Sequence, residues 1–285
     1  MSYGAKILKD SISYEGHRLT TFEVTFPRIV LAEFNTHRVF SRNSASSRAI
    51  PVSKMLARVV EDPFIPTYWG KNQKGMQAVE ELSPEAQTRA CSEWLLARDN
   101  AVAVVKRLQM PDIDLHKQIA NRLLEPWLWH TVIVTGTEWI NFFALRDNKM
   151  AQPEISTPAR MMRQFYETAK PEKPYKGWHL PLVFDEDKEE VFAKCESSDA
   201  ALEMLVKISC ARCARVSYLT HDGKRDLSED IALHDKLLVS GHMSPLEHAA
   251  RVRNDQTEPL MVGNFRGWVQ HRKMIRGEAV FTGGA

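Results

Sequence analysis

The pattern of apolar and polar positions separates an N-terminal part with strand character from a longer helical part. Residues 5–13 and 18–27 alternate apolar and polar side chains around a turn at 14–17, which predicts two paired strands. A short apolar run at 28–34 predicts a buried helix. From Ser83 to Asn148 the apolar spacing is helical, with breaks at residues 110–112 and at Pro126. The stretch after Pro126 is apolar enough to be central and fully buried.

The last third of the chain predicts two further helices. One covers residues 197–218 and is capped near Ser197 or Ser198, and the other covers 228–240 and ends at Gly241. The Pro- and Lys-rich stretch at 170–177 predicts an exposed connection. Because no linker is long or biased enough to require two units, we expect a single α+β domain over residues 1–285, with helices packed around a mainly antiparallel sheet. Its parts are an N-terminal segment (22–50), a helical core (83–170) and a C-terminal segment (198–278).

Charge and composition narrow the class of protein. The 38 basic and 36 acidic residues leave a formal net charge of +2, so anion binding must come from local clusters. A dedicated nucleic-acid-binding protein is usually more basic, and we expect no nucleic-acid partner. The N-terminus has no signal-peptide core, and no apolar run approaches membrane-spanning length. The sequence predicts a cytoplasmic protein with no membrane partner.

The cysteines do not indicate a disulfide framework. Cys210 and Cys213 form a CxxC motif, but it lies inside the predicted helix at 197–218. No second CxxC and no nearby HxxxH completes a zinc set. Two packed helix cysteines are therefore favoured over a metal or redox pair, and we expect no metal site.

A polar stretch, NTHRVFSRNSASSRAIP at residues 35–51, directly follows the short buried helix. Arginine forks match phosphate oxygens, and Ser and Asn side chains add neutral donors, so the stretch suits phosphate binding. The alternative, slightly favoured by residue types alone, is a solvated loop with cations at a helix C-terminus. Glycine-rich phosphate loops and a GxSxG nucleophile elbow are absent from the sequence, so a nucleotide would be held by side chains.

Two other polar positions allow two interpretations each. In GHMSPLEH at residues 241–248, two histidines and a carboxylate could bind a metal, but no third ligand has convincing spacing. The same segment fits a helix that begins at Ser244 with a proline in its first turn. Arg146 ends a strongly apolar helix and therefore needs an anionic or polar partner. That partner is either a bound ligand or a neighbouring carboxylate, Asp147 or Glu154.

These clusters together resemble the flavin-dependent thymidylate synthases. The signature of that family is an Arg-His-Arg triplet followed by spaced Ser, Asn-Glu, Ser and Arg-Tyr. The Ala-Arg-Val-Ser and Gly-His-x-(Ser/Thr)-Pro-Phe-Glu-His segments of the family resemble residues 214–217 and 241–248, and its Asn-Phe-(two apolar)-Leu-Arg helix end resembles 141–146. In the family, the Ala-Arg-Val-Ser and Gly-His segments precede the triplet, so this chain resembles a circularly permuted, phage-type variant. The triplet positions here are His37, Arg38, Ser41, Asn43, Ser46 and Arg48.

The C-terminus resembles a partial second copy of the triplet segment. The strand, helix and polar loop expected at 22–48 are similar to those expected at 249–278, with His37 and Arg38 matching His271 and Arg272. Glu278 falls at the spacing of the family's glutamate, which the first copy lacks. The first copy departs from the family pattern at four positions, and one flavin-contacting histidine is replaced by methionine. The departures are Glu33, Thr36, Ser44, Ala49 and Met150.

The resemblance implies an enzymatic function. In the family, FAD and 5,10-methylenetetrahydrofolate place a methyl group on C5 of dUMP, NADPH reduces the flavin, and no enzyme cysteine attacks the pyrimidine. The departures in the triplet leave open a related reaction, hydroxymethylation of dUMP or dCMP. A non-catalytic nucleotide- or nucleic-acid-binding protein is a further alternative, which the near-neutral charge disfavours. The family also implies a homo-oligomer, a dimer or tetramer, with the active site at a subunit interface.

The resemblance also implies roles for individual residues. Arg146, which would contact the base and stabilise an enolate-like oxygen, and Ser46 are expected to be catalytic. The expected cofactor contacts are His37, Arg38, Asn141, Ser217, His242, Ser244, Glu247, His271 and Arg272. The expected contacts to a deoxypyrimidine monophosphate are Ser41, Asn43, Ser46, Arg48, Arg122, Arg146, Gln270 and Glu278.

Overall fold

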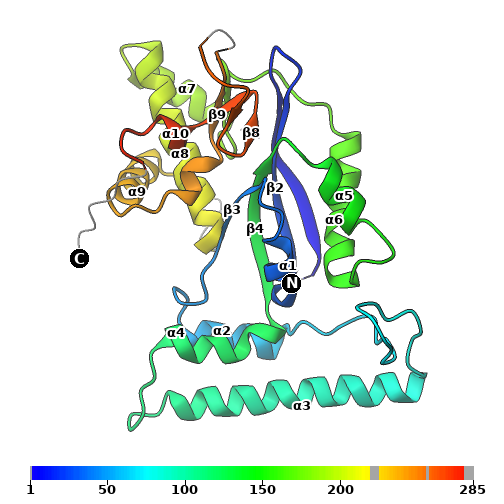
Figure 1. Cartoon of the computed structure of the whole chain (residues 1–285). Helices are drawn as coiled ribbons and strands as arrows, with labels where there is room; N and C mark the ends of the chain where they lie inside the picture. Colours follow the sequence, from blue (N-terminus) through cyan, green and yellow to red (C-terminus); the bar gives the residue numbers. More distant parts are fainter. Residues whose placement is uncertain (1, 219–224, 255–256, 279–285) are drawn as a thin grey trace.

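The centre of the molecule is an antiparallel sheet. The computed structural model describes residues 2–218, 225–254 and 257–278. Four strands lie in the order β1-β2-β4-β3 (Figure 1). Their bounds are β1 Gly4–Ile12, β2 Arg18–Pro27, β3 Ser41–Ser44 and β4 Trp129–Gly136. Every neighbouring pair in this sheet is antiparallel, which confirms the α+β class expected from the sequence.

Strand β4 corrects the helical prediction for this part of the chain. Its middle is a run of β-branched residues, from Thr131 to Thr135, which favour strands. Val132 and Val134 face one core cluster and Ile133 faces another, so the strand is buried on both faces. A strand that is apolar on both faces loses the alternation that would mark it, and periodicity alone does not separate it from a buried helix.

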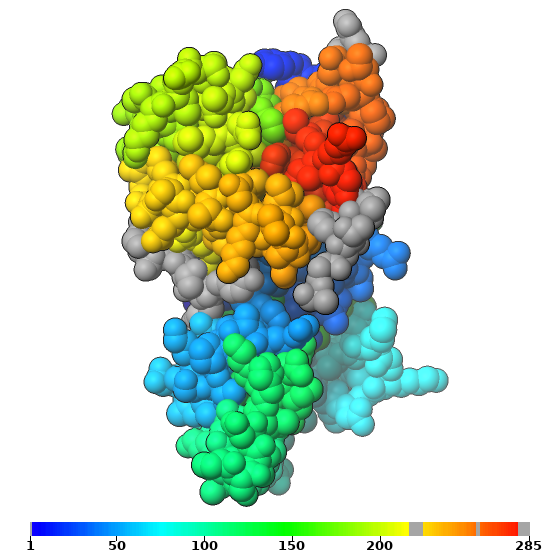
Figure 2. Space-filling view, turned by 90° about the vertical axis from the view of Figure 1, so that its left-hand side faces the viewer, coloured from blue at the N-terminus to red at the C-terminus, as the bar shows by residue number. Residues whose placement is uncertain are grey.

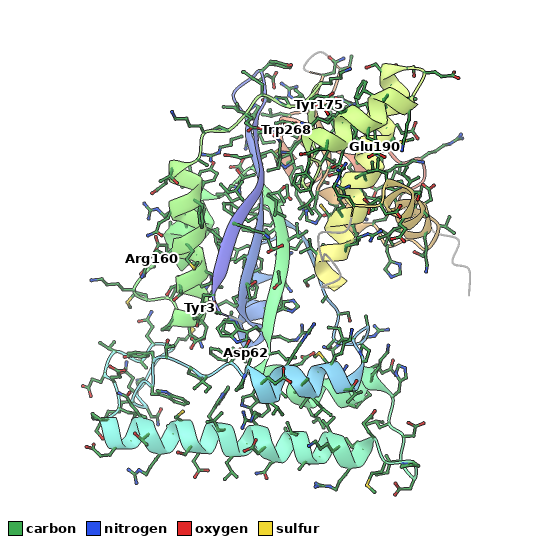
Figure 3. All side chains as sticks on the ribbon, turned by 180° about the vertical axis from the view of Figure 1, so that it is seen from behind. Tyr3, Asp62, Arg160, Tyr175, Glu190 and Trp268 are labelled. Atoms are coloured by element: carbon green, nitrogen blue, oxygen red, sulfur yellow. The ribbon has the colours of Figure 1, made fainter. Side chains whose placement is uncertain are left out.

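One face of the sheet is covered by helices α5 (Ile140–Arg146) and α6 (Pro153–Thr168). Figure 3 shows α6 against this face, with Arg160 pointing away from the sheet. The short helices η1 (Arg28–Val30) and α1 (Leu31–Phe34) contribute to the same layer, as the apolar run predicts. The shared core is rich in aromatic rings: Phe22, Phe26, Phe34, Phe40, Trp139, Phe142 and Phe143.

The other face is covered by α8 (Ser198–Tyr218), with α7 (Asp185–Lys194) and α9 (Leu227–Val239) outside it. The sequence placed α8 and α9 correctly. The hydroxyl of Ser197 accepts the N–H of Ala200 at 3.1 Å, which makes Ser197 the cap of α8. Gly241, with φ of 72°, follows the C-terminus of α9.

A buried arginine fixes these three helices to one another. Arg212 of α8 is 2 % exposed and pairs with Asp187 of α7 at 2.6 Å and with Asp230 of α9 at 2.8 Å. Although burial alone would raise the pKa of Asp187, hydrogen bonds from Arg212 and other donors hold it below its ordinary value. Loss of Arg212 would leave two buried carboxylates close together, so the network constrains how α7, α8 and α9 pack.

A helical layer lies beyond one end of the sheet (Figure 1). It contains α2 (Val52–Glu61), α3 (Pro84–Leu108), α4 (Lys117–Ala120) and η2 (Asn121–Trp127). Met55, Val59, Val105 and Leu124 form its core. None of the described helices combines the length and the hydrophobicity that crossing a bilayer requires.

The C-terminal third adds short elements to the opposite end of the sheet. The strands β5 (Trp178–His179), β6 (Ala250–Val252) and β9 (Trp268–Gln270) form a small sheet, and β7 (Met261–Val262) pairs with β8 (Phe265–Arg266). Trp268 lies near the turn between β1 and β2, where its Nε1 donates to the carbonyl of His17 at 3.0 Å (Figure 3).

The expected internal repeat is not reproduced as a strand, helix and loop. Residues 249–278 form strands first and then the short helix α10 (His271–Met274). His271 and Arg272 therefore begin a helix, whereas His37 and Arg38 lie in the turn between α1 and β3. The sequence similarity of the two segments is local, because in the C-terminal segment β6 pairs with β5 and β9 pairs with β6, whereas α10 begins directly after β9.

Five polar side chains in the buried centre are connected by a continuous series of hydrogen bonds. His248 Nδ1 contacts the hydroxyl of Thr135 at 2.8 Å, which contacts that of Thr21 at 2.7 Å. Thr21 contacts His179 Nε2 at 2.8 Å, and His179 Nδ1 contacts Ser11 at 2.9 Å. All five side chains are buried, and their hydrogen bonds connect strands β1, β2 and β4 to the C-terminal elements.

The buried histidine His248 predicts a pH-dependent stability. Burial lowers the pKa of His248 from 6.5 to about 3, so only the unfolded chain takes up a proton between these values. The free energy of unfolding should therefore fall as the pH drops below 6.5, by about 1.4 kcal/mol per pH unit for this histidine. Urea unfolding at pH 7 and pH 5 measures the difference. His248→Gln should reduce the loss by about 2 kcal/mol, and an unchanged pH dependence would contradict the assignment.

Candidate active site

The polar stretch at 35–51 is partly a strand rather than a loop. Residues Ser41–Ser44 form β3, an edge strand that pairs with β4. Arg42 donates from Nη1 to the carbonyls of Asn35 at 3.1 Å and His37 at 2.9 Å, just beyond the C-terminus of α1. For Arg42 the structural interpretation is therefore correct, because the cation satisfies carbonyls at a helix end.

Asn43 joins three segments that are far apart in the sequence. Its Nδ2 donates to the carbonyl of Cys213 in α8 at 3.0 Å, and its Oδ1 accepts from the hydroxyl of Ser244 at 3.2 Å. The triplet segment, the Ala-Arg-Val-Ser helix and the Gly-His segment thus meet at one side chain.

Five of the expected site residues line a single pocket of about 440 Å³. Figure 2 views this side of the molecule, with the α9 region (orange) above the segment around residue 50 (blue). The segment Asn43–Ala49 forms one wall, and residues following α9 form the other. The expected residues in the lining are Asn43, Ser46, Arg48, His242 and Ser244.

The pocket is rich in groups that suit an anionic ligand. Ser46, Arg48 and His242 are exposed, and Arg48 forms no ion pair with any residue in the described ranges. A guanidinium without a carboxylate partner, next to hydroxyl and amide donors, suits a phosphate. The pocket also falls within the size range of small-molecule sites.

The pocket also contains two polar residues from a segment that no motif singles out, His116 and Gln118. His116 caps α4 through its Nδ1, which accepts the N–H of Gln118 at 3.3 Å, and both side chains line the pocket. No spacing rule links residue 116 to residue 43, because α3 and the break after it lie between them. The only sequence feature near His116 and Gln118 is that the helical pattern resumes after residues 110–112, and this feature does not indicate a pocket.

Arg146 forms a second cluster outside the pocket lining. Its Nε donates to His37 Nε2 at 2.8 Å, and its Nη1 pairs with Glu33. The pairing with Asp147 or Glu154 considered from the sequence is wrong. Glu33 precedes Arg146 by more than a hundred residues and reaches it because α1 and α5 pack on the same face of the sheet.

His37 is neutral in this cluster. Burial, and then the charges of Arg146 and Arg42, lower its pKa from 6.5 to about 4. Because Arg146 donates to Nε2, that nitrogen carries the lone pair and Nδ1 carries the proton. His37 therefore positions Arg146 as a hydrogen-bond acceptor without adding a positive charge.

The Gly-His segment differs in detail from the expected helix start. Residues Ser244–Glu247 form the 3₁₀ helix η3, whose cap position is Met243. Ser244 makes no capping bond, because its hydroxyl is used on Asn43. Glu247 pairs with Arg272 at 2.6 Å, and Arg272 also pairs with Glu278 at 2.7 Å. This ion-paired row connects η3 to the C-terminal segment.

Other expected residues lie elsewhere. Gln270 Nε2 donates to Ser41 Oγ at 2.7 Å, and both side chains are buried, so within one chain they join two segments rather than line the pocket. Arg122 pairs with Glu125 at 2.8 Å and lines a different hollow. Arg38 and Asn141 are exposed on other surfaces of the described chain. The side chain of Ser217 lies outside the part of the chain that is described, and His271 contacts His234 at 3.3 Å.

The fold is of the α+β class with a polar pocket at one side, and comparison with known proteins gives the family of the chain. The family model for thymidylate synthase complementing proteins matches residues 13–172, which is more than half of the chain. The chain belongs to this family. Membership confirms the resemblance drawn from the motifs and places the chain among enzymes of the thymidylate synthase type. The match ends before the C-terminal segment, so the permuted order of the last third stays a prediction.

Solved structures that are similar to part of this chain include two of one bacterial enzyme. One is a UMP/dUMP methylase, PolB, from Streptomyces cacaoi bound with 5-Br dUMP, at 16% identity and a TM-score of 0.47, covering 58% of this chain and 90% of that one. The other is the same methylase bound with 5-Br UMP, at 17% identity and a TM-score of 0.45, covering 58% and 88%. No curated protein sequence matches the chain.

The contacts of Asn43 predict a measurable coupling with Ser244. Asn43→Ala should lower the free energy of unfolding by about 1–3 kcal/mol, because it leaves buried polar groups without their partner. In a double-mutant cycle with Ser244→Ala, the coupling energy should be about 0.5–1.5 kcal/mol. Ser46→Ala, an exposed change in the same segment, should stay within about 0.5 kcal/mol of the parent. Strict additivity in the cycle would contradict the bond.

Proposed function

We propose that the chain catalyses the FAD-dependent transfer of a one-carbon unit from 5,10-methylenetetrahydrofolate to C5 of dUMP, which gives dTMP. The observation that carries the proposal is the shared pocket, in which the triplet residues Asn43, Ser46 and Arg48 face His242 and Ser244 of the Gly-His segment. Family membership supports the reaction class. NADPH serves as the reductant in this proposal.

The residues of the pocket fit phosphate-bearing ligands. Arg48 supplies an uncompensated positive charge, and Ser46, His116 and Gln118 supply polar groups around it. His242 and Ser244 would hold part of the flavin from the opposite wall. When bound, FAD supplies the electron transfer that converts the one-carbon unit to a methyl group. In this proposal the chain itself binds the nucleotide and holds it in one orientation.

Arg146 would stabilise charge on the pyrimidine. Its Nε and Nη1 are held by His37 and Glu33, and its Nη2 has no hydrogen bond to any residue of the described ranges. A guanidinium fixed at two nitrogens keeps its third nitrogen pre-oriented. Such a donor stabilises the negative charge on a ring oxygen in the enolate-like form of the pyrimidine, the form in which C5 is nucleophilic. Ser46, which lines the pocket, would contact the same nucleotide.

The division of the expected residues into two clusters supports a site shared between subunits. Within one chain the pocket, the Arg146 cluster and Arg122 lie apart, as they would if each chain contributed one part to each of several active sites. Helix α5 also has an exposed apolar surface, with Ile140 83% and Leu145 53% exposed. An apolar surface next to expected ligand residues suits an interface. We propose a homo-oligomer, a dimer or tetramer, that acts in the cytoplasm.

Hydroxymethylation of dUMP or dCMP is the second candidate. Ser44 stands where the family has a glutamate, and it lines the pocket. Exchanging a carboxylate for a small hydroxyl at this wall removes a charge and leaves space that a water molecule could occupy. Trapping of the one-carbon intermediate by water would then give a hydroxymethyl product.

Identifying the product tests the proposal directly. The protein is incubated with FAD, NADPH, 5,10-methylenetetrahydrofolate and either dUMP or dCMP, and the nucleotide is analysed by mass spectrometry. We expect methylated dUMP. A hydroxymethylated product would select the second candidate, because the same one-carbon chemistry would end in water capture. A colourless protein that binds no flavin and yields no product would overturn both.

Because Arg48 has no ion pair in the described chain, its substitution should weaken the binding of dUMP selectively. Arg48→Gln should weaken dUMP binding about tenfold to a hundredfold, because it removes a charge-assisted hydrogen bond to phosphate. Arg89→Gln is the matched control, since Arg89 is an exposed arginine of α3 without an ion pair in the described chain. Calorimetric titration of both variants measures the difference. Equal affinities would remove Arg48 from the nucleotide site.

A further inference from the structure

Three metal-ligating side chains converge outside the pocket. They are Cys210 of α8, His234 of α9 and His271 of α10, and one ligand atom from each lies within 4.8 Å of the other two. Cys210 and His234 are buried, and His271 is half-buried. Neither the pocket nor the Arg146 cluster uses Cys210 or His234, and His271, a cofactor contact expected from the resemblance, does not line the pocket. The proposed reaction therefore does not explain why these three groups meet.

The spacing of the ligand atoms suits a tetrahedral divalent ion. Nε2 of His234 and Nε2 of His271 are 3.3 Å apart. Zinc-to-nitrogen bonds of about 2.0–2.1 Å and zinc-to-sulfur bonds of about 2.3 Å at tetrahedral angles require ligand atoms about 3.3–3.7 Å apart. The two histidines already have this separation, and the thiol, within 4.8 Å of both nitrogens, needs to approach by about 1.5 Å at most.

The surroundings orient one ligand as metal sites commonly do. Nδ1 of His234 contacts the carboxylate of Asp235 at 2.9 Å, which places the proton on Nδ1 and leaves the lone pair on Nε2. Lys207 shares this carboxylate at 3.2 Å. The backbone N–H of His271 donates to the carbonyl of Ala249 at 2.9 Å, which fixes the start of α10 beside the other ligands.

The protonation states are compatible with metal binding. Burial, and then the neighbouring His234 and Lys207, lower the pKa of His271 to about 4, so its imidazole is neutral near pH 7. Burial raises the pKa of the Cys210 thiol well above its ordinary value. A bound cation would displace the thiol proton to solvent, and one metal–thiolate bond would form for each proton released.

We propose that Cys210, His234 and His271 bind a zinc-type divalent cation that fixes α10 to α8 and α9. One sulfur and two imidazole nitrogens suit zinc, and a water completes four-coordination. The role is structural. His271 is followed directly by Arg272, which pairs with Glu247 of the Gly-His segment at 2.6 Å, so the metal would hold this ion pair in register.

The CxxC motif provides a matched pair of variants. Cys213 is also fully buried, but it packs against Ile133, Leu182 and Val216 rather than the histidines. Cys210→Ala and Cys213→Ala therefore remove the same atoms from the same helix, and only the first removes a ligand. Asp235→Asn tests the orienting carboxylate without touching a ligand.

The experiment uses the full chain without a polyhistidine tag, stripped with a chelator and titrated with Co²⁺ and then Zn²⁺. We expect one Co²⁺ per chain with a thiolate charge-transfer absorption in the parent protein and in Cys213→Ala. Cys210→Ala should lose this absorption and bind zinc at least about a hundredfold more weakly, and Asp235→Asn about tenfold to a hundredfold more weakly. Zinc should raise the Tm of the parent and of Cys213→Ala, but not that of Cys210→Ala.

Two outcomes would overturn the proposal. Cobalt binding of equal strength in all four proteins, without the thiolate absorption, would mean that other side chains hold the ion. No binding at micromolar metal would mean that His234 and His271 form only a hydrogen-bonded pair. Both readouts are independent of flavin, folate and turnover, so they are unaffected by whether the proposed reaction is correct.

Discussion

The pairing of β4 with β2 on one side and with β3 on the other is the constraint on which the rest of the structure depends. It places a strand that is buried on both faces at the centre, so each face needs its own layer of helices. It also gives the polar segment at 41–44 a fixed backbone. Without this pairing, Asn43 would not be held within hydrogen-bonding distance of both α8 and η3.

The candidate site combines compensated and uncompensated charge. Arg146 and Arg272 each have carboxylate partners, Glu33 and Glu247, so their positions are fixed before any ligand arrives. Arg48 has no such partner in the described chain and is exposed. An enzyme that must both orient a nucleotide and attract its phosphate benefits from this division, because fixed donors lose little entropy on binding and a free cation gains the most from an anion.

Local patterns predicted local structure well. The alternation at 5–13 and 18–27 predicted the β1–β2 hairpin, and the serine cap and the glycine stop predicted α8 and α9. The motifs predicted the family. Five of the residues that they single out line one pocket, and the roles of these residues stay predictions. The prediction failed where the structure depends on contacts between residues far apart in the sequence. Periodicity alone does not distinguish β4 from a buried helix. The ion pair between Arg146 and Glu33 depends on how helices α1 and α5 pack. Convergence of residues 210, 234 and 271 likewise follows from packing, so no spacing rule could detect it.

The central position of β4 also has a consequence for how the chain folds. Pro27 pairs with Trp129, so about a hundred residues must be closed into a loop before β2 meets its inner neighbour, whereas β1 and β2 pair across a short turn. During synthesis the hairpin can form early, with one edge of β2 left open until β4 leaves the ribosome. Until β4 is synthesised, the unpaired edge of β2 can pair with another chain, and the rate at which β4 is synthesised sets how long this edge stays open.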